Sequence, residues 1–322
     1  MLTMQTCKGV VAGLAMLGGV ELLTTDSLAV QKFSDWSEPV NLGPLVNSAF
    51  TDSYPAISNK GLSLYFASTR PGSVGDVPNA DIWVARRATV NDPWGPPVNL
   101  GSNINTTFVE DAPAISRDGH WLFFDSTRPD DAHGGLDHWV SWRAHTDDDF
   151  GWLPAVNLGP GINTSFLDAG PAPFENDDVG SPLLFFVSNR LNPASGGNGN
   201  DIYVAERTPN GTYEGVLSVD ELNSPLGEFR PTIRYDGLEI VFGSNRPLQG
   251  ISGSSLWMSS RTTVYEPWSP PVSLGTIINS GAFENIPYLS PDGRELYFSA
   301  FRADRLGGSD LYVSTRSRRT GR

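Results

Sequence analysis

The sequence lacks most of the residues and motifs on which enzyme and nucleic-acid sites depend. It has a single cysteine, Cys7, so no disulfide can form within the chain, an absence that is neutral about export. No G-x-S-x-G elbow, phosphate-binding glycine loop or redox motif occurs. Only 22 Lys and Arg stand against 36 Asp and Glu, which gives a formal net charge of −14. Since these cations form no basic run, we expect no nucleic-acid partner.

Long hydrophobic runs are equally scarce, and the one that exists lies near the N-terminus. Lys8 precedes the apolar stretch Val10–Val20, and the small residues Ser27–Ala29 follow it. The stretch is too short for a membrane-spanning helix, and this order of features is typical of a secretory signal peptide. We therefore predict a leader at residues 1–29 and a mature chain at 30–322 that is periplasmic or secreted and has no membrane span. A later translation start is the alternative.

What the chain does contain is one pattern repeated five times. In each copy a carboxylate stands three residues before a proline, which opens a short apolar run. A turn, an apolar strand ending in Arg, a glycine-rich loop and a second strand ending in Arg follow. The prolines are 58, 58, 60 and 56 residues apart, and four residues are inserted in the third copy within Glu175–Ser181. The five repeated prolines are Pro55, Pro113, Pro171, Pro231 and Pro287. Such a period predicts a repeat architecture rather than two unrelated domains.

Each copy is predicted to hold four short strands and no helix. A Pro-Val-Asn-Leu-Gly-like strand opens the copy, as in Trp94–Gly101, and its most degenerate version is Tyr213–Asp220. The proline strand, an Asp-Gly hairpin turn and strands such as Trp121–Ser126 and Asp137–Arg143 follow. Five such units predict an all-β fold, a five-bladed β-propeller with four antiparallel strands per blade. We expect a monomer in which the N-terminal strand, Pro39–Gly43, completes the last blade.

Three runs connect the repeat to a known family: Ser116–Phe123 (SRDGHWLF), Ser290–Phe298 (SPDGRELYF) and Asp201–Val204 (DIYV). With the Ser-x-Arg that follows the second strand of a copy, they resemble the WD40-like repeats of TolB-type propellers over residues 36–316. The resemblance implies the fold and little about activity. TolB itself is a periplasmic adaptor between proteins. Its additional N-terminal domain has no counterpart in this sequence, so its partners are not implied here.

The repeated carboxylates are the first candidates for a binding site. They precede the strand that should line the central channel, on the face that carries the glycine-rich loops. Together they predict a ring that focuses a negative potential and raises the pKa of some of its own carboxyl groups. Such a ring favours a cation or a basic peptide segment. The ring comprises Asp52, Glu110, Asp168, Glu228 and Glu284, while Asp111 and Arg230 break its symmetry.

The ring also has a structural interpretation, which we favour because a residue repeated in every blade is more often a fold determinant. Each carboxylate would accept N–H groups in its own loop or pair with an arginine of the repeat. We expect the strand-ending Arg70 and its counterparts to pair across the loop with the next aspartate, here Asp81. Any metal would be held by the same ring. Calcium could bind there or at Gly196–Asp201 (GGNGND), which matches one copy of a calcium-binding repeat.

The histidines offer no further site. His120, His133, His138 and His145 all fall in the second copy, and we expect them at the surface because their spacing matches no zinc signature.

The preferred interpretation is a binding module that takes a protein, peptide or glycan on the face of the carboxylate ring. The alternative is a carbohydrate-active enzyme of the five-bladed glycoside-hydrolase type, with Glu110, Asp168 and Glu228 or a similar triple in the central funnel. Such an enzyme needs two carboxyl groups in unlike environments, whereas the repeat places equivalent acids in equivalent settings. A deep funnel with two acids that differ in burial would favour the enzyme, and a narrow, evenly lined channel the binding module. A metal-stabilised structural module is the third hypothesis.

Overall fold

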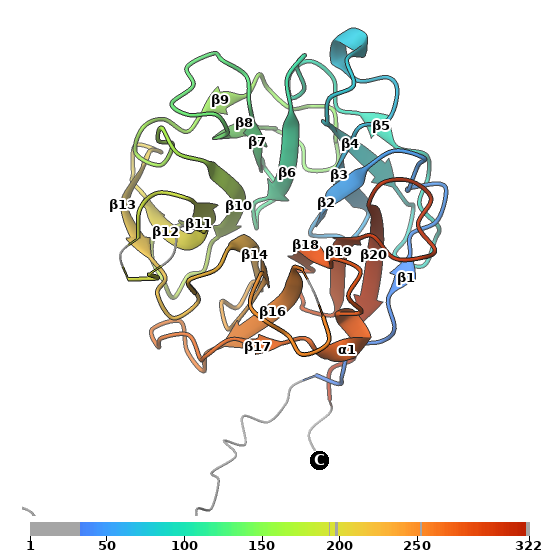
Figure 1. Cartoon of the computed structure of the whole chain (residues 1–322). Coiled ribbons are helices and arrows are strands. Elements are labelled where there is room, and N and C mark those ends of the chain that lie inside the picture. Colours follow the sequence, from blue (N-terminus) through green and yellow to red (C-terminus); the bar gives the residue numbers. More distant parts are fainter. Residues whose placement is uncertain (1–32, 193, 197–198, 252, 320–322) are drawn as a thin grey trace, which may run out of the picture.

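The structure, a computed structural model, describes residues 33–192, 194–196, 199–251 and 253–319, so the predicted leader at residues 1–29 lies outside it. Five four-stranded antiparallel sheets surround a central axis (Figure 1). The predicted all-β, five-bladed propeller is confirmed. The described residues form only two helical segments, α1 (Gly275–Ile278) and the 3-10 turn Val74–Asp76. In this part of the chain no helix is long and apolar enough to cross a membrane.

Each blade runs from an innermost strand at the axis to an outermost strand at the rim. Blade 1 comprises β2 (Asp52–Ile57), β3 (Ser63–Ser68), β4 (Asp81–Arg86) and β5 (Val98–Asn99). Blade 2 comprises β6 (Glu110–Ile115), β7 (Trp121–Ser126), β8 (Asp137–Trp142) and β9 (Val156–Asn157). Blade 3 comprises β10 (Asp168–Phe174), β11 (Leu183–Ser188), β12 (Asp201–Arg207) and β13 (Tyr213–Ser218). Blade 4 comprises β14 (Glu228–Ile233), β15 (Glu239–Ser244), β16 (Ser255–Ser260) and β17 (Val272–Ser273). Blade 5 comprises β18 (Asn285–Leu289), β19 (Glu295–Ala300), β20 (Asp310–Thr315) and β1 (Val40–Asn41).

The ring closes with the N-terminal strand, as predicted. β1 pairs antiparallel with β20, with Val40 opposite Val313, and an isolated bridge joins Phe33 to Arg318 (Figure 1). The last blade is therefore assembled from both ends of the described chain. Closure removes the free sheet edge that an open array would expose.

The outermost strand that departs most from the sequence pattern is the longest one. β13 has six residues, whereas β1, β5, β9 and β17 have two each. Asn210 and Gly211 lie in a short turn that Thr208 and Thr212 close with a backbone hydrogen bond of 2.8 Å. Because an Asn-Gly turn joins strands without a longer loop, pairing of β13 with β12 begins immediately after the turn.

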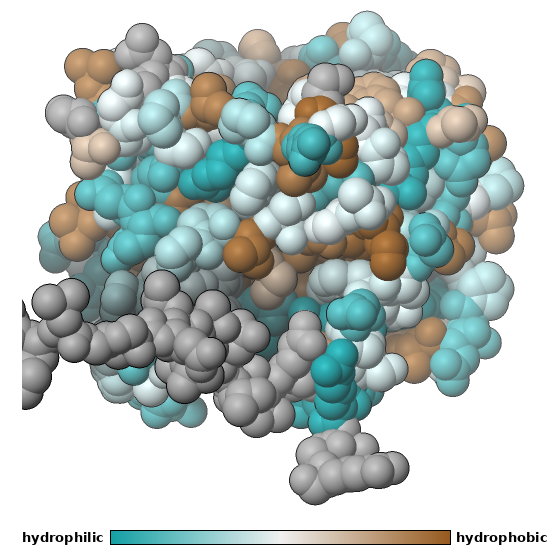
Figure 2. All heavy atoms as spheres, turned by 60° about the horizontal axis from the view of Figure 1, so that its bottom comes forward, coloured by the Kyte–Doolittle hydropathy of each residue, from teal (hydrophilic) through white to brown (hydrophobic). Residues whose placement is uncertain are grey.

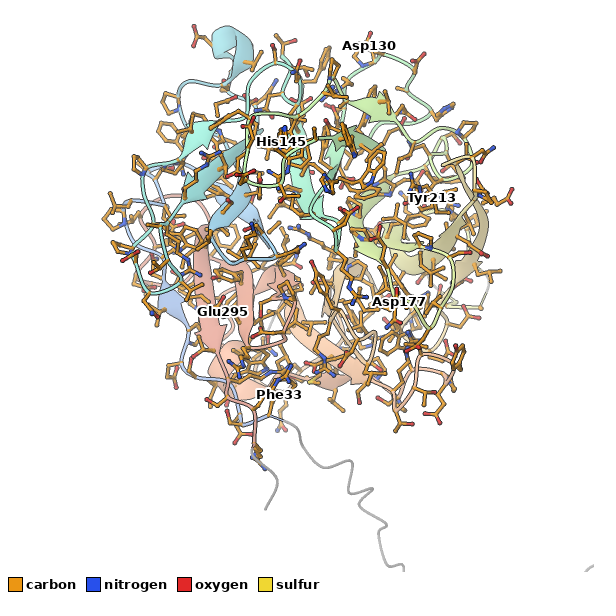
Figure 3. The ribbon with its side chains drawn as sticks, turned by 180° about the vertical axis from the view of Figure 1, so that it is seen from behind. Phe33, Asp130, His145, Asp177, Tyr213 and Glu295 are labelled. Atoms are coloured by element: carbon orange, nitrogen blue, oxygen red, sulfur yellow. The ribbon has the colours of Figure 1, made fainter. Side chains whose placement is uncertain are left out.

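Repeated side chains hold neighbouring blades together. Asn105 accepts the N–H of Ile82 at 2.8 Å and donates to the carbonyl of Ile82 at 2.9 Å, which ties the loop entering blade 2 to blade 1. The same pair of bonds is made by Asn47, Asn163, Asn223 and Asn279. Side chains fill the space between the sheets (Figure 3). Each second strand contributes one fully buried phenylalanine: Phe66, Phe124, Phe186, Phe242 and Phe298.

Candidate functional site

The five repeated carboxylates stand at the start of the innermost strands, and all are fully buried. In blade 1, Asp52 accepts the N–H and the hydroxyl of Ser48 at 2.6 and 2.8 Å through Oδ2. Its Oδ1 accepts the hydroxyl of Ser68 at 2.6 Å and Nη2 of Arg70 at 2.5 Å. The ion pair recurs as Glu110–Arg128 at 3.2 Å, Asp168–Arg190 at 2.6 Å, Glu228–Arg246 at 3.6 Å and Glu284–Arg302 at 3.1 Å. These contacts are those of the structural alternative, and use of the ring as a ligand site stays a prediction.

Two details expected of the repeated carboxylates and arginines are wrong. Arg70 pairs with Asp52 rather than with Asp81, which instead accepts the N–H of Val74 and the amide of Asn99. Burial raises the pKa of Glu110, and it raises the pKa of Glu228 to about 7. Neighbouring ring charges are not the cause. Glu110, Asp168 and Glu228 are each bonded within their own blade, and their use as a catalytic triple stays a prediction.

The innermost strands lose their symmetry just beyond the carboxylates, where each has a β-bulge. The second residue after the carboxylate has a positive φ in every blade. A bulge re-aims the side chains around it, and non-glycine residues in this conformation cluster at functional sites. The five residues are Tyr54 (φ 55°), Ala112 (49°), Gly170 (66°), Arg230 (25°) and Ile286 (56°). Since they differ in chemistry, the centre of the ring is not five-fold symmetric.

Blade 2 carries a row of three polar side chains behind this bulge. Asp111 of β6 lies opposite Asp125 of β7, which lies opposite His138 of β8. Nδ1 of His138 is 2.7 Å from Oδ1 of Asp125, and the N–H of Gly170 donates to Oδ2 of Asp125 at 2.6 Å. Asp125 and His138 are fully buried, whereas Asp111 is partly exposed and its Oδ1 has no hydrogen-bond partner among the described residues.

The two aspartates of the row differ in the contacts that shift the pKa of their carboxyl groups. Burial raises the pKa of both carboxyl groups. For Asp125 the contacts with His138 and Gly170 oppose that rise. For Asp111 the charge of Asp125 adds to it, so the pKa of Asp111 lies well above its usual range. Asp111 therefore has the more strongly raised pKa of the two, and the partners of Asp125 favour its charged form.

Arg230 crosses the channel from blade 4. Its guanidinium lies 5.5 and 5.8 Å from the ring centres of Tyr54 and Tyr288, and Nη2 donates to the carbonyl of Pro113. The residue is only 3% exposed, and burial lowers its pKa to about 10. Within the described residues Nη1 has no partner, and no carboxylate lies within ion-pair distance of Arg230. A buried cation with a free donor is a second unsatisfied group beside Asp111.

Gly170 leaves the space that Arg230 needs. A Cβ at Gly170 would lie 3.0 Å from Cα of Arg230, whereas at Gly159, which also has a positive φ, a Cβ would meet nothing within 4 Å. Gly159→Ala should lower the free energy of unfolding by about 1–2 kcal/mol, because alanine is strained in the left-handed backbone conformation. Gly170→Ala should lower it by about 1–3 kcal/mol more, because the added methyl group overpacks the site. Denaturant unfolding of both variants checks the difference. Equal losses would mean that Arg230 is free to move away.

Below Arg230 the channel is nearly closed. The cavity there measures about 20 Å³, the space of one water molecule, and Pro171, Pro231 and Tyr288 line it. The channel below Arg230 therefore leaves no room for a ligand larger than a water molecule. Among the described residues, Asp111 and Asp125 differ in burial, as the enzyme hypothesis requires, but the channel is nearly closed rather than a deep funnel.

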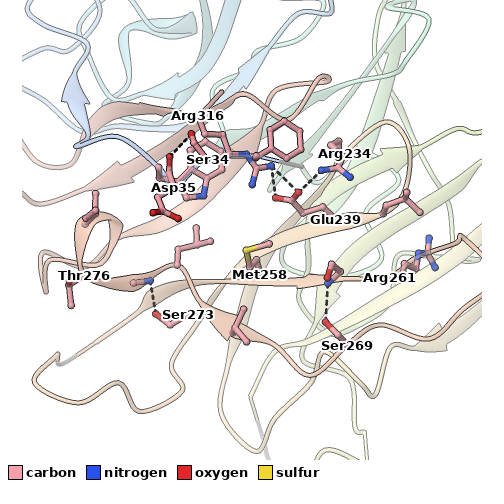
Figure 4. A pocket seen from close by; sticks show the side chains of 18 of the residues that line it. Ser34, Asp35, Arg234, Glu239, Met258, Arg261, Ser269, Ser273, Thr276 and Arg316 are labelled. Atoms are coloured by element: carbon pink, nitrogen blue, oxygen red, sulfur yellow. Dashed lines mark hydrogen bonds and ion pairs between the residues drawn. The ribbon is translucent and has the colours of Figure 1, made fainter. Parts of the chain in front are cut away.

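A larger groove of about 950 Å³ lies away from the channel, between blade 4 and the N-terminal residues of blade 5 (Figure 4). Phe33, Trp36 and Met258 contribute to its apolar wall. Glu239 accepts Nη2 of Arg316 at 2.7 and 2.8 Å and Nη1 of Arg234 at 2.5 Å. These charges satisfy one another, so the groove indicates no particular ligand. On the face shown in Figure 2, hydrophobic residues occur in small groups among polar ones.

The described residues contain no group of three or more His, Cys, Asp or Glu side chains arranged to hold a metal ion. Gly197 and Asn198 of the calcium-like stretch lie outside the described residues. His133 and His145 are exposed, as expected, and His120 is partly exposed with its ring stacked on Trp142. The expectation of a surface position is wrong for His138, which is 0% exposed.

Comparison with known proteins identifies the fold and no family. No family model matches the sequence, and no curated protein is similar to it in sequence. A thermostable family-43 glycoside hydrolase has a similar structure, with a TM-score of 0.57, 14% identity, and 88% of this chain and 94% of that chain covered. The catalytic domain of a GH62 α-L-arabinofuranosidase from Coprinopsis cinerea matches with a TM-score of 0.55 and 11% identity, and 89% of this chain and 98% of that chain are covered. A family 117 glycoside hydrolase from Zobellia galactanivorans matches with a TM-score of 0.57 and 13% identity, and 88% of this chain and 91% of that chain are covered. At these identities the likeness concerns the fold alone.

Proposed function

We propose that the protein acts on a glycan at the mouth of its central channel, as a carbohydrate-active propeller of the glycoside-hydrolase type. The observation that carries the proposal is the Asp111–Asp125 pair. Its members sit in unlike environments, because Oδ1 of Asp111 has no partner among the described residues, whereas both oxygens of Asp125 are bonded, to His138 and Gly170. Burial and the charge of Asp125 raise the pKa of Asp111 well above its usual range, while the contacts of Asp125 oppose the rise of its own pKa. Glycoside cleavage requires a carboxyl group that is protonated near neutral pH, and such pairs supply one.

The unsatisfied atoms of the site fit a sugar. Oδ1 of Asp111 and Nη1 of Arg230 both lack a partner in the described part of the chain. Both atoms are buried, so a sugar hydroxyl, which donates and accepts at once, would bond to them only after the side chains shift. The similar solved structures named above are glycoside hydrolases, which supports the same ligand class. The predicted leader would place the activity in the periplasm or outside the cell.

In this proposal Asp111 is the catalytic residue. It gives its proton to the glycosidic oxygen as the bond from that oxygen to the anomeric carbon breaks, and a water molecule bonds to that carbon and releases a proton to solvent. Asp125 and His138 are positioning residues, since both are fully buried and act through Asp111. Burial and the charge of Asp125 raise the pKa of Asp111, and the contact with His138 favours the charged form of Asp125 and fixes its side chain.

One observation favours a second candidate, glycan binding without turnover. Hydrolysis by either usual route needs another carboxylate that reaches the substrate or its water. Asp125 cannot do this where it lies, because it is 0% exposed and both of its oxygens are bonded. A propeller with Asp111 alone at the mouth would hold a glycan and release it unchanged.

A panel assay separates the two candidates. The full chain is incubated with aryl α-L-arabinofuranosides, arabinan and xylan, while product release and binding are measured in parallel. The test variant is Asp111→Asn, and the matched control is Asp130→Asn, on an exposed loop of the same blade. Product release lost only in Asp111→Asn supports the enzyme, and binding lost in Asp111→Asn without any product supports the binding module. If neither product nor binding is seen, or if Asp111→Asn changes nothing, the proposal is wrong.

A further inference from the structure

Four of the five loops that enter the innermost strands expose one apolar side chain at the same position. The residue two before each buried carboxylate is Phe50 (43% exposed), Phe108 (41%), Phe166 (41%) or Leu226 (41%). In the fifth copy this position is Ala282, and the next residue, Phe283, is 45% exposed and meets Phe301 edge-on with ring centres 6.1 Å apart. We call Phe50, Phe108 and Phe166 the rim phenylalanines.

The backbone under each rim phenylalanine is fixed from both sides. Phe108 donates its N–H to the hydroxyl of Thr106 at 3.1 Å, and Thr106 is itself bonded to the buried Glu110. The glycine-rich loop of the preceding blade closes against the other side. A Cβ at Gly134 of blade 2 would lie 2.6 Å from the carbonyl oxygen of Phe166. The loops are therefore pre-organised, and what they present to solvent is the ring.

The fold does not require an aromatic ring at this position. Leu226 and Ala282 occupy it in the other two copies, with the same bonds between the loop and the buried carboxylate. Exposed apolar side chains gathered on one face mark an interaction site. Here they lie on the loops that enter the innermost strands, and in blade 2 that loop leads directly to Asp111.

The distance to Asp111 suits a chain of sugar units. Phe108 precedes Asp111 by three residues, which span at most about 10 Å of extended backbone. A sugar ring presents a face of C–H bonds with partial positive charge, and the face of an aromatic ring is negative. A unit held at Asp111 would thus have neighbours within reach of the rim.

We infer that the rim phenylalanines are stacking platforms for the glycan units that flank the one at Asp111. The inference rests on the proposed function and narrows its ligand to an oligosaccharide or polysaccharide lying across the channel mouth, rather than a monosaccharide or disaccharide. Since the chain carries a net charge of −14, a neutral glycan suits it better than a strongly anionic one.

Calorimetric titration with neutral oligosaccharides of increasing length tests the inference. The probes are α-1,5-arabino-oligosaccharides and β-1,4-xylo-oligosaccharides, each from disaccharide to octasaccharide. Wild-type affinity should rise with length. The double variant Phe108→Ala/Phe166→Ala should bind the octasaccharide with an affinity lower by about tenfold per ring removed. Its affinity for the disaccharide should fall by less than about twofold. Phe108→Trp should keep the long-chain affinity.

The matched control is Val98→Ala/Val156→Ala, which removes apolar side chains of 50% and 59% exposure from the outermost strands. It should bind every probe as wild type does, and both double variants should unfold at the wild-type denaturant concentration. Binding through Asp111 that does not strengthen with length would overturn this inference and leave the proposed function standing. An unchanged length dependence in the rim variant would do the same. No binding of any probe would overturn both.

Discussion

Replacing Asp52 by asparagine should lower the free energy of unfolding by about 3–5 kcal/mol, because it breaks a buried ion pair and leaves its cation uncompensated. Asp52 is 0% exposed and its carboxylate receives four bonds, from Ser48, Ser68 and Arg70. An asparagine amide would keep one acceptor oxygen and set an NH₂ group against donors. Denaturant unfolding of the variant and wild type measures the loss.

Asp92→Asn is the matched control. Asp92 also accepts a backbone N–H, that of Thr89 at 2.8 Å, but it lies on an exposed loop. Its loss should stay within about 1 kcal/mol. A cost for Asp52→Asn no larger than that of the control would contradict the structural interpretation. The ring carboxylates would then be free to serve as the predicted ligand site.

The blades could be predicted from the sequence because five copies specify the same local structure independently. Each copy repeats the pair of signals that matter, an apolar strand such as Trp121–Ser126 and a tight turn before it. Closure followed from counting strands. The length of the outermost strand of blade 3 could not be predicted from its side chains, which match the repeat poorly. The length of β13 depends instead on the turn at Asn210 and Gly211.

The centre of the channel was only partly predictable. Asp111 and Arg230 stood out as departures from the repeat, and they lie on the innermost strands β6 and β14. Asp125 and His138 could not be found, since each looks like an ordinary strand residue until register sets them opposite each other. The pairing that decides their chemistry is non-local, and the bulge that turns Tyr54 and Arg230 inward leaves no signal in sequence spacing.

Asp111→Asn should abolish proton donation, lowering kcat/KM by about 10²–10⁴-fold, while making the fold more stable at neutral pH. Burial and the charge of Asp125 raise the pKa of Asp111 well above its usual range in the folded chain. Between the ordinary pKa of an unfolded aspartate and that raised value, the folded chain binds more protons than the unfolded one. The free energy of unfolding therefore falls as pH rises through this window. Asparagine cannot ionise, so the variant should lose that dependence. Unfolding curves across the acidic-to-neutral range need no substrate and give a readout apart from activity.

Asp125→Asn should move the activity profile rather than abolish it. With Asp111 as proton donor, kcat/KM falls as pH rises through the pKa of Asp111 in the free enzyme. The charge of Asp125 is one cause of that raised pKa, so its removal should shift the alkaline limb to lower pH and leave activity at acidic pH nearer to wild type. A substitution that merely loosened the site would lower activity at every pH alike. An unshifted limb would mean that Asp125 does not set the proton affinity of Asp111, and the division of roles between the two aspartates would be wrong.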